Sequence, residues 1–295
     1  MRSFFSIFLF LLPFLLDAQQ LLIREITFEG LNRTRAQYIE GFLTLEKGVG
    51  TSLEQLEVNR QRLANLEVLS DVQLEIDTLD EGLSLTFDCK ELYALLPILG
   101  FGGIAENFWL QGGVTDVNLL GRGYKAYLAY QYYDRHSISA HLSFDWVNNS
   151  PWGFNVNFVK WSTLEPLYFD AGQVNYNYDN YTYGLDGIYH FNFRDKLLVG
   201  GAYFTEAYDA TGELVADAPA YAFKRKWLMK VMVEHDRSNW FYYFRDGWQH
   251  QLHAQTVYTV DEPSFYIAFN DLKYYERVGQ RGNFASRLRM GLSSN

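Results

Sequence analysis

From about residue 95 onward, apolar and polar side chains alternate in short segments. Between residues 137 and 146 the even positions, from Ile138 to Trp146, are all apolar, and the odd positions, from Ser137 to Asp145, are all polar. Because a β-strand sends successive side chains to opposite faces, such a segment has one apolar and one polar face. The pattern predicts an antiparallel β-structure for the larger, C-terminal part of the chain.

Eleven strands are predicted in this part. They cover residues 97–103, 108–118, 124–132, 137–146, 152–159, 181–193, 196–206, 226–235, 247–260, 265–275 and 283–292. The intervals 160–180 and 207–225 are predicted to be long loops at one end of the strands. At the other end, 119–123 is predicted to be a tight, glycine-marked turn and 236–246 a long connection.

The first part of the chain carries a different pattern. A strand over 22–29 precedes a helix over 34–43 that Thr34 caps, and Ser52 with Gln55 forms a capping box for a second helix. The apolar residues on one face of this second helix are Leu53, Leu56, Leu63 and Leu66. Strands over 71–77 and 83–91 follow, and Cys89 is predicted to pack in the core. The order β-α-α-β-β indicates a small α+β domain.

Residues 1–18 are predicted to be a secretory signal peptide. Arg2 supplies a positive charge, residues 4–16 form an apolar run, and Ala18 is a small residue at the cleavage point. A run of about 13 residues is shorter than the ~20 that a membrane-spanning helix needs. No cysteine stands directly after the cleavage point, so no lipoprotein anchor is expected. Behind such a signal, the alternating strands are typical of a bacterial outer-membrane β-barrel.

The composition is consistent with a barrel. Aromatic residues make up 18% of the chain, and all seven tryptophans lie beyond residue 108. Trp and Tyr favour the interface between membrane and water. A soluble β-sandwich with an aromatic core is the alternative, although its strands are usually shorter. The net charge of −10 argues against a nucleic-acid partner, which would need a basic surface.

The sequence offers no arrangement of residues for catalysis. His250 and His253 are three apart in one predicted strand, so they face opposite sides and cannot share a metal. His235 and Asp236 could form an acid–base pair, but a structural role is the better interpretation. The glycines of 100–103 lack the helix and the Lys-Ser/Thr pair of a phosphate-binding loop, and are interpreted as weakening strand pairing. We expect no enzymatic activity, no metal and no cofactor.

Residues 19–91 resemble a POTRA domain, the polypeptide-transport-associated module. The resemblance includes the element order, the opening segment 26–30, the leucine-bearing second helix and Glu91 at the end of the third strand. It implies a periplasmic domain that binds extended client chains by strand addition at a sheet edge. A simple periplasmic plug or spacer is the alternative.

Residues 92–295 resemble the N-terminal part of the barrel in the outer-membrane assembly superfamily, to which BamA, TamA and the two-partner secretion transporters belong. Three motifs occur in the family's order. The matching positions are Asp116, Asn118, Gly121 and Gly123 in the first, Asp236, Arg237, Asn239 and Gly247 in the second, and Asp271 and Tyr274 in the third. One departure is that the usual proline before Gly247 is absent, and Phe244 and Arg245 stand there.

A second departure is the family's sixth external loop, whose arginine–glycine–aromatic motif does not occur. The resemblance therefore implies about 11 of the family's 16 strands, that is, a transmembrane antiparallel barrel segment. An open sheet leaves unpaired backbone groups at its edge, which is costly in lipid. We expect a truncated product or a gene fragment. An eleven-strand barrel, or an assembly completed by another chain, is the alternative.

The resemblance implies a factor for outer-membrane protein insertion or translocation, located in the outer membrane with its N-terminal domain in the periplasm. The expected partners are unfolded outer-membrane or secreted clients, outer-membrane lipid and accessory assembly proteins. The strand edge expected to bind clients comprises Leu99, Gly100, Phe101, Gly102 and Gly103. Two alternatives are a two-partner secretion pore for one exoprotein and a passive porin-like channel or surface antigen.

Overall fold

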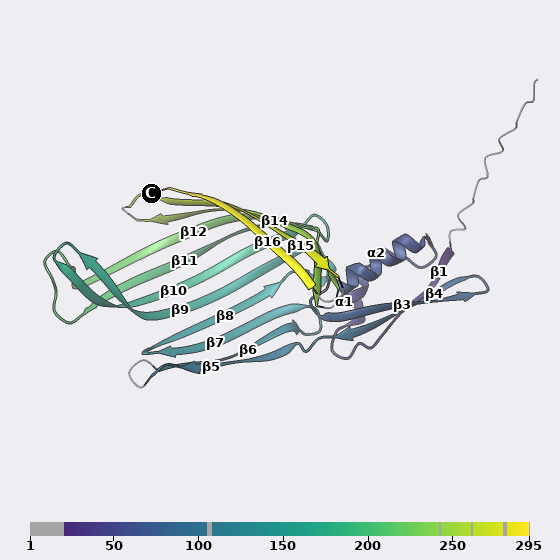
Figure 1. Cartoon of the computed structure of the whole chain (residues 1–295), viewed down its shortest axis with the longest axis horizontal. Helices are drawn as coiled ribbons and strands as arrows, with labels where there is room; N and C mark the ends of the chain where they lie inside the picture. The colour runs from purple at the N-terminus through teal and green to yellow at the C-terminus, as the bar shows by residue number, and fades with distance from the viewer. Residues whose placement is uncertain (1–20, 105–107, 242, 261, 280–281, 295) are drawn as a thin grey trace, which may run out of the picture.

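The computed structural model describes residues 21–104, 108–241, 243–260, 262–279 and 282–294. A small α/β domain lies at one end of a large, curved antiparallel sheet (Figure 1). The predicted signal peptide, residues 1–18, lies outside the described residues. Among the described residues, no helix combines the length and the apolar composition that crossing a bilayer requires.

The small domain contains the predicted β-α-α-β-β order with one added two-residue strand. Its elements are β1 (Leu21–Glu29), α1 (Ala36–Glu40), β2 (Gly50–Thr51), α2 (Leu53–Ala64), β3 (Leu69–Leu79) and β4 (Gly82–Glu91). The strands form a sheet in the order β2-β1-β4-β3. Strands β1 and β4 are parallel, whereas β3 is antiparallel to β4, which leaves β3 at an edge.

The core of this domain lies between α2 and the sheet. Leu56 and Leu63 of α2 pack with Leu85, Phe87 and other buried side chains of the strands. Cys89 is buried among them, as predicted, and burial raises the pKa of its thiol to about 12.

Two details of the helices differ from the predictions. The capping box of Ser52 and Gln55 is confirmed, but Leu53 is 69% exposed, because α2 starts at this residue and only its later leucines reach the sheet. Thr34 does not cap α1, which begins after Arg35 and covers only five residues. The Thr34 hydroxyl instead accepts a hydrogen bond from the side chain of Asn118 in the large sheet.

The large sheet contains the eleven predicted strands. They are β5 (Leu95–Gly102), β6 (Trp109–Leu119), β7 (Tyr124–Tyr133), β8 (Arg135–Phe144), β9 (Trp152–Phe169), β10 (Gly172–His190), β11 (Asp195–Thr211), β12 (Tyr221–Asp236), β14 (Phe244–Thr259), β15 (Phe265–Val278) and β16 (Gly282–Ser293). Consecutive strands in this series are paired antiparallel. A short strand, β13 (Asn239–Phe241), pairs with the start of β14, so the predicted long connection 236–246 is partly a hairpin.

The prediction of long loops at 160–180 and 207–225 is wrong. Strands β9 and β10 continue through the first interval to a tight turn at Asp170, and β11 and β12 leave only 212–220 outside the sheet. Figure 1 shows these strands extending beyond β5–β8. The extension is stable because its alternate residues Val174 and Tyr176 are buried, a pattern that the surrounding Asn, Asp and Pro residues obscure in the sequence.

The sheet separates its side chains into an apolar face and a polar face. The apolar face comprises the even positions of β9 from Trp152 to Phe158 and the residues in register with them. One row across this face consists of Phe158, Tyr183, Tyr203, Trp227 and Tyr258. The polar face comprises the alternate positions, and it carries the pairs Lys230–Asp186 (2.9 Å), Lys196–Glu234 (3.1 Å) and Lys226–Glu206 (2.6 Å).

The apolar face contains an uncharged band from β8 to β16. The band lies between the row Lys160–Tyr181–Thr205–Arg225 and the row Asp195–His235–His250. Between these rows, no described residue of the apolar face is Asp, Glu, Lys or Arg. Many of its large side chains are exposed in the isolated chain, among them Leu185 and Met229.

Tyr176 provides a test of the extended hairpins, because its side chain is fully buried and its hydroxyl donates to the carbonyl of Pro219 (2.7 Å). We predict that Tyr176→Ala destabilises the fold by about 3 kcal/mol and exposes 212–220 to proteases. Tyr176→Phe, which removes only the hydrogen bond, should cost about 1 kcal/mol. The measurements are urea unfolding in detergent and limited proteolysis. Tyr168→Ala is the control, because Tyr168 is exposed, and an equal effect of both alanine variants would contradict the prediction.

Candidate functional site

The free edge of β5 is the first candidate site. Among the described residues, β5 pairs only with β6, and β16 at the other end of the series pairs only with β15. Leu99 and Phe101 lie on the apolar face of β5 and are 83% and 76% exposed. The edge therefore presents unpaired backbone N–H and C=O groups next to exposed apolar side chains, which is a template for another strand.

The glycines of β5 have a packing role that the sequence did not reveal. Gly100 and Gly102 lie on the polar face opposite Gln111 and Trp109. A Cβ atom at either glycine would approach the Trp109 ring to 3.0 or 2.9 Å, so the glycines let this ring lie across the strand. Gly103 lies just beyond β5 and has a φ of +94°, a conformation suited to glycine.

The first family-like motif forms the turn between β6 and β7 and contacts the small domain. Asn118 accepts a hydrogen bond from the Gly123 amide and donates one to Thr34 Oγ1, both at 2.8 Å. Asp116 accepts from the Asn118 amide (2.9 Å) and forms an ion pair with Arg33. These bonds fix the conformation of the turn and join it to the segment that leads into α1.

Gly121 and Gly123 allow the small domain to approach this turn closely. Both have positive φ angles, +69° and +64°. A Cβ atom at Gly121 would lie 2.2 Å from the carbonyl oxygen of Arg33, and one at Gly123 would lie 2.1 Å from the Tyr38 hydroxyl. Larger residues at either position would therefore clash with the docked domain.

The second family-like motif makes a separate contact with the small domain. Asn239 Oδ1 accepts hydrogen bonds from Asn65 at the end of α2 (3.0 Å) and from Arg194 (2.8 Å). Trp240 extends the contact, because its amide donates to Asn65 (2.9 Å) and its carbonyl accepts from Gln61 (2.9 Å). Gln61 and Asn65 were not predicted as contact residues, since polar residues on an exposed helix face carry no distinguishing sequence signal.

The remaining residues of the second motif shape the hairpin of β13. Asp236 accepts from the Ser238 amide (2.8 Å) and pairs with Arg245 (3.0 Å). Arg245, one of the two residues that stand where the family's proline is expected, therefore has a structural partner here. Gly247 has a φ of +105°, and a Cβ atom there would lie 2.3 Å from the carbonyl oxygen of Arg237.

His235 and Asp236 do not form a pair. The His235 ring instead contacts Asp195 across the sheet, and Arg237 pairs with the same carboxylate (3.3 Å). These contacts hold β11 against β12, which agrees with a structural role. Among the described residues, no three His, Cys, Asp or Glu side chains converge as a metal site would require.

The third motif lies on β15, and among the described residues Asp271 and Tyr274 form no hydrogen bond or ion pair with the small domain. Asp271 is buried on the polar face, where it accepts a hydrogen bond from Arg287 Nε (2.7 Å). Arg289 lies on the same face over the Phe269 ring (3.9 Å), so both arginines lie on the polar face. Tyr274 lies on the opposite face, and its hydroxyl donates to Glu276 (3.3 Å).

An aromatic cluster joins the core of the small domain to the large sheet. Phe42 lies 5.5 Å from the ring centres of both Trp146 and Phe193, and Trp146 stacks on His190 at 4.0 Å. The guanidinium of Arg62 lies 4.0 Å above the Phe193 ring. Trp146 was predicted on the apolar face of a strand, which is wrong, because β8 ends at Phe144 and the chain then turns toward α1.

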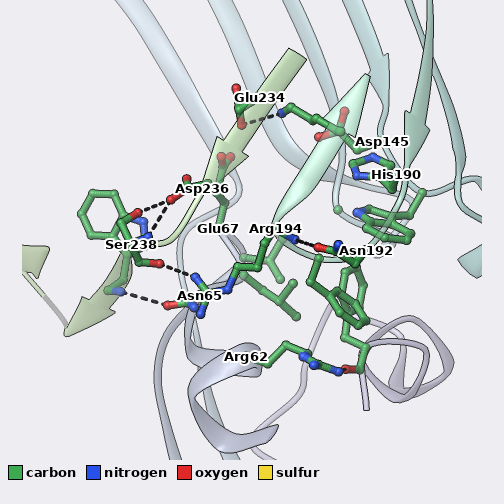
Figure 2. A pocket seen from close by; sticks show the side chains of 18 of the residues that line it. Arg62, Asn65, Glu67, Asp145, His190, Asn192, Arg194, Glu234, Asp236 and Ser238 are labelled. Carbon is green, nitrogen blue, oxygen red and sulfur yellow. Dashed lines mark hydrogen bonds and ion pairs between the residues drawn. The ribbon is translucent and has the colours of Figure 1, made fainter. Parts of the chain in front are cut away.

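A cavity of about 710 Å³ opens beside this cluster, at the end of the sheet nearest the small domain (Figure 2). Its lining includes Arg62, Arg194, Asp145 and Glu234. Figure 2 shows Arg194 between Asn65 on one side and the aromatic side chains on the other. The junction is therefore a mixed contact, partly apolar and partly a network of hydrogen bonds around a polar opening.

Glu91 stabilises the segment of the small domain that contacts the β6–β7 turn. Its carboxylate accepts hydrogen bonds from the amides of Thr34 (2.6 Å) and Arg33 (3.1 Å), the residues that bind the β6–β7 turn. Burial raises the pKa of Glu91, but the hydrogen bonds from Thr34 and its neighbours outweigh this effect and leave the pKa below its ordinary value. The sequence placed Glu91 only at a strand end and did not indicate this role.

No protein-family model matches the chain, and no curated protein matches it. Solved structures with a similar fold include a BamA and a CdiB. BamA from Haemophilus ducreyi lacking POTRA domains 1-3 is 12% identical with a TM-score of 0.57, covering 92% of this chain and 55% of that one. CdiB from Escherichia coli is 14% identical with a TM-score of 0.55, covering 93% and 54%. The chain spans about half the length of these proteins, and it has the fold of their β-barrels.

The lowered pKa of Glu91 makes docking depend on pH. A carboxylate whose pKa is lower in the folded state contributes stability that is complete above its unfolded pKa, ~4.3, and is lost as the pH falls through the folded pKa. We predict that Glu91→Gln destabilises the small domain by about 1 kcal/mol at pH 7. The difference from wild type should vanish in acid, below the folded pKa. Urea unfolding at a series of pH values measures the difference in unfolding free energy between variant and wild type. Glu29→Gln is the control, because Glu29 is exposed. A difference for Glu91→Gln that persists in acid would contradict the prediction.

Proposed function

We propose that the chain is an outer-membrane protein of the BamA/TamA type, which inserts or translocates other proteins. The observation that carries this proposal is the free edge of β5, in a sheet that also carries an uncharged apolar band and a docked α/β domain. A strand edge of this kind offers sequence-independent hydrogen bonds to a client, because it is the backbone that pairs. The fold shared with BamA and CdiB supports the same function.

The apolar band supports placement in a bilayer. On β12 the band runs from Arg225 to His235, about 33 Å along the strand at ~3.3 Å per residue. A strand tilted by about 40° then spans about 25 Å, close to the apolar band of outer-membrane barrels. The Lys–Asp and Lys–Glu pairs lie on the opposite face, which in a barrel lines the interior.

The proposed orientation follows from the place of the small domain. The small domain and residues 92–94 lie at the end of the sheet opposite the β9–β10 turn. We propose that this end faces the periplasm, which puts the β9–β10 turn outside the cell. Residues 1–18 act as the signal peptide that directs export. The partners are outer-membrane lipid, unfolded outer-membrane or secreted clients, and accessory assembly proteins.

In the proposed mechanism, two sheet edges bind the client in turn. The small domain corresponds to a POTRA domain, and its edge strand β3 holds an extended segment in the periplasm. The segment then pairs with β5, which satisfies backbone groups that would each cost several kcal/mol unpaired in lipid. Strand pairing makes and breaks no covalent bond, so the proposed activity needs neither a cofactor nor an enzymatic centre.

A second candidate function is a secretion pore of the two-partner type for one exoprotein. The similarity to the CdiB fold supports it. Depletion of the protein in its host distinguishes the candidates. Loss of many outer-membrane proteins from the outer membrane is expected for an insertion factor, and loss of a single exoprotein would support the pore. Altered uptake of small solutes alone would contradict both and indicate a passive channel.

We predict that client strands pair at β5. Photo-reactive or cysteine cross-linkers at Leu99 and Phe101 in the full chain should capture nascent outer-membrane proteins. Tyr203, which lies on the same face of a fully paired inner strand, is the matched control and should capture lipid only. Protein adducts of equal yield at Tyr203 and Phe101, or none at β5, would contradict the proposal.

The bilayer placement predicts that an added charge costs more stability on the apolar face than on the polar face. Leu185→Arg puts a guanidinium in the apolar band and should cost about 2–4 kcal/mol of unfolding free energy in lipid vesicles. Gln251→Arg lies on the polar face beside Glu234 and should cost less than about 1 kcal/mol. Urea unfolding in vesicles measures both values. Equal costs would show that the apolar face does not lie in hydrocarbon.

A further inference from the structure

Two cations mark the outer border of the apolar band. Lys160 on β9 and Arg225 on β12 lie in the same transverse row, Lys160–Tyr181–Thr205–Arg225, and both belong to the apolar face. The row is the one immediately beyond the aromatic row of Phe158 and Trp227. In the orientation proposed above, this row borders the hydrocarbon of the outer leaflet. Because the strands are tilted by about 40°, the row is tilted as well, and the two cations differ in height by about 9 Å over three strand spacings.

The partners of these cations differ from those of the lysines on the polar face. Lys226 and Lys230 each have a carboxylate within 3.0 Å, on Glu206 and Asp186. Lys160, in contrast, lies 5.9 Å from the centre of the Tyr181 ring, and Arg225 lies 5.5 Å from that of Phe223. Among the described residues, neither Lys160 nor Arg225 has a carboxylate within ion-pair distance.

The acidic residues of this face that lie nearest to the two cations are further out along the strands. Asp179 is one row beyond Lys160 and forms a hydrogen bond with the Ser162 hydroxyl. Asp209 is two rows beyond Arg225. The row of the two cations therefore keeps a positive charge at the membrane border.

We propose that Lys160 and Arg225 bind the phosphates of a diphosphorylated glycolipid of the outer leaflet, the chemistry of lipid A. The proposal rests on the membrane placement given above. The two positions are three strands apart, or about 14 Å at the ordinary strand spacing. A disaccharide with a phosphate at each end presents two anions at a separation of this order, whereas a common phospholipid presents one.

The geometry of the row suits such a ligand. A guanidinium forms paired hydrogen bonds with a phosphate, and a lysine ammonium acts as a point charge. The rings of the neighbouring aromatic row, with Phe158 and Tyr183 at 5.3 Å and Tyr203 and Trp227 at 4.8 Å, form a flat surface for the first part of the acyl chains. The phosphates would thus contact the two cations, and the acyl chains would contact the neighbouring aromatic rings.

The test compares the full chain with the double variant Lys160→Gln/Arg225→Gln in phosphatidylethanolamine vesicles. Titration with fluorescent diphosphoryl lipid A measures affinity, and monophosphoryl lipid A and phosphatidylglycerol are the competing probes. Each cation lost should weaken binding of diphosphoryl lipid A about fivefold, and both together roughly 25-fold. Lys224→Gln is the matched control. It removes a neighbouring charge from the other face, where Lys224 pairs with Glu262, and should leave the affinity unchanged.

The outcomes separate the two proposals. Resistance of the vesicle-bound chain to alkaline extraction reports insertion into the bilayer. If alkali extracts the wild-type chain, both the membrane placement and the lipid site are wrong. If wild type and double variant both insert but bind diphosphoryl lipid A equally, only the lipid site is wrong. A preference for phosphatidylglycerol over diphosphoryl lipid A would also overturn it.

Discussion

Each strand of the large sheet divides its side chains between two unlike environments, and this division fixes the register of the whole sheet. A slip of one residue in any strand would move its charged residues to the apolar face. The polar face carries ion pairs that depend on this register: Lys230 and Asp186 lie in one row across three strands, and Arg287 lies diagonally across from Asp271 on the neighbouring strand. The same alternation leaves Leu99 and Phe101 exposed beside the free backbone of β5.

Two of the family-like motifs have a structural role at the junction between the small domain and the large sheet. The first two motifs lie in turns at the same end of the sheet, and both bind the small domain, one through Thr34 and the other through Asn65. The two contacts hold different ends of the helical layer, with the aromatic cluster around Trp146 between them. The domain is therefore held at separate points, which restricts its rotation relative to the sheet more than a single contact would.

The sequence predicted the strands of the sheet well because a period of two is a strong and local signal. It also predicted the turn that contains Gly121 and Gly123, because glycine marks turns and tolerates the positive φ angles found there. The hairpin over 160–180 was missed because its apolar positions are few and are separated by Asn and Asp, which usually mark loops.

Local sequence patterns could not predict contacts between segments that are distant in the chain. Nothing in the composition of α2 distinguishes Gln61 and Asn65, which bind Trp240, from polar residues that face water. The true partner of Thr34 also lies far away in the chain, so the local cap was the natural but wrong interpretation. The free edge of β5 could be expected from the family resemblance, but the packing of Trp109 over the glycines of β5 could be recognised only in the structure.

The direction of the strands limits what can complete this sheet. Because the eleven main strands alternate in direction, β5 and β16 point the same way. A second copy inserted in the same sense would meet either edge only as a parallel neighbour. An antiparallel closure therefore needs an odd number of intervening strands, whichever polypeptide supplies them.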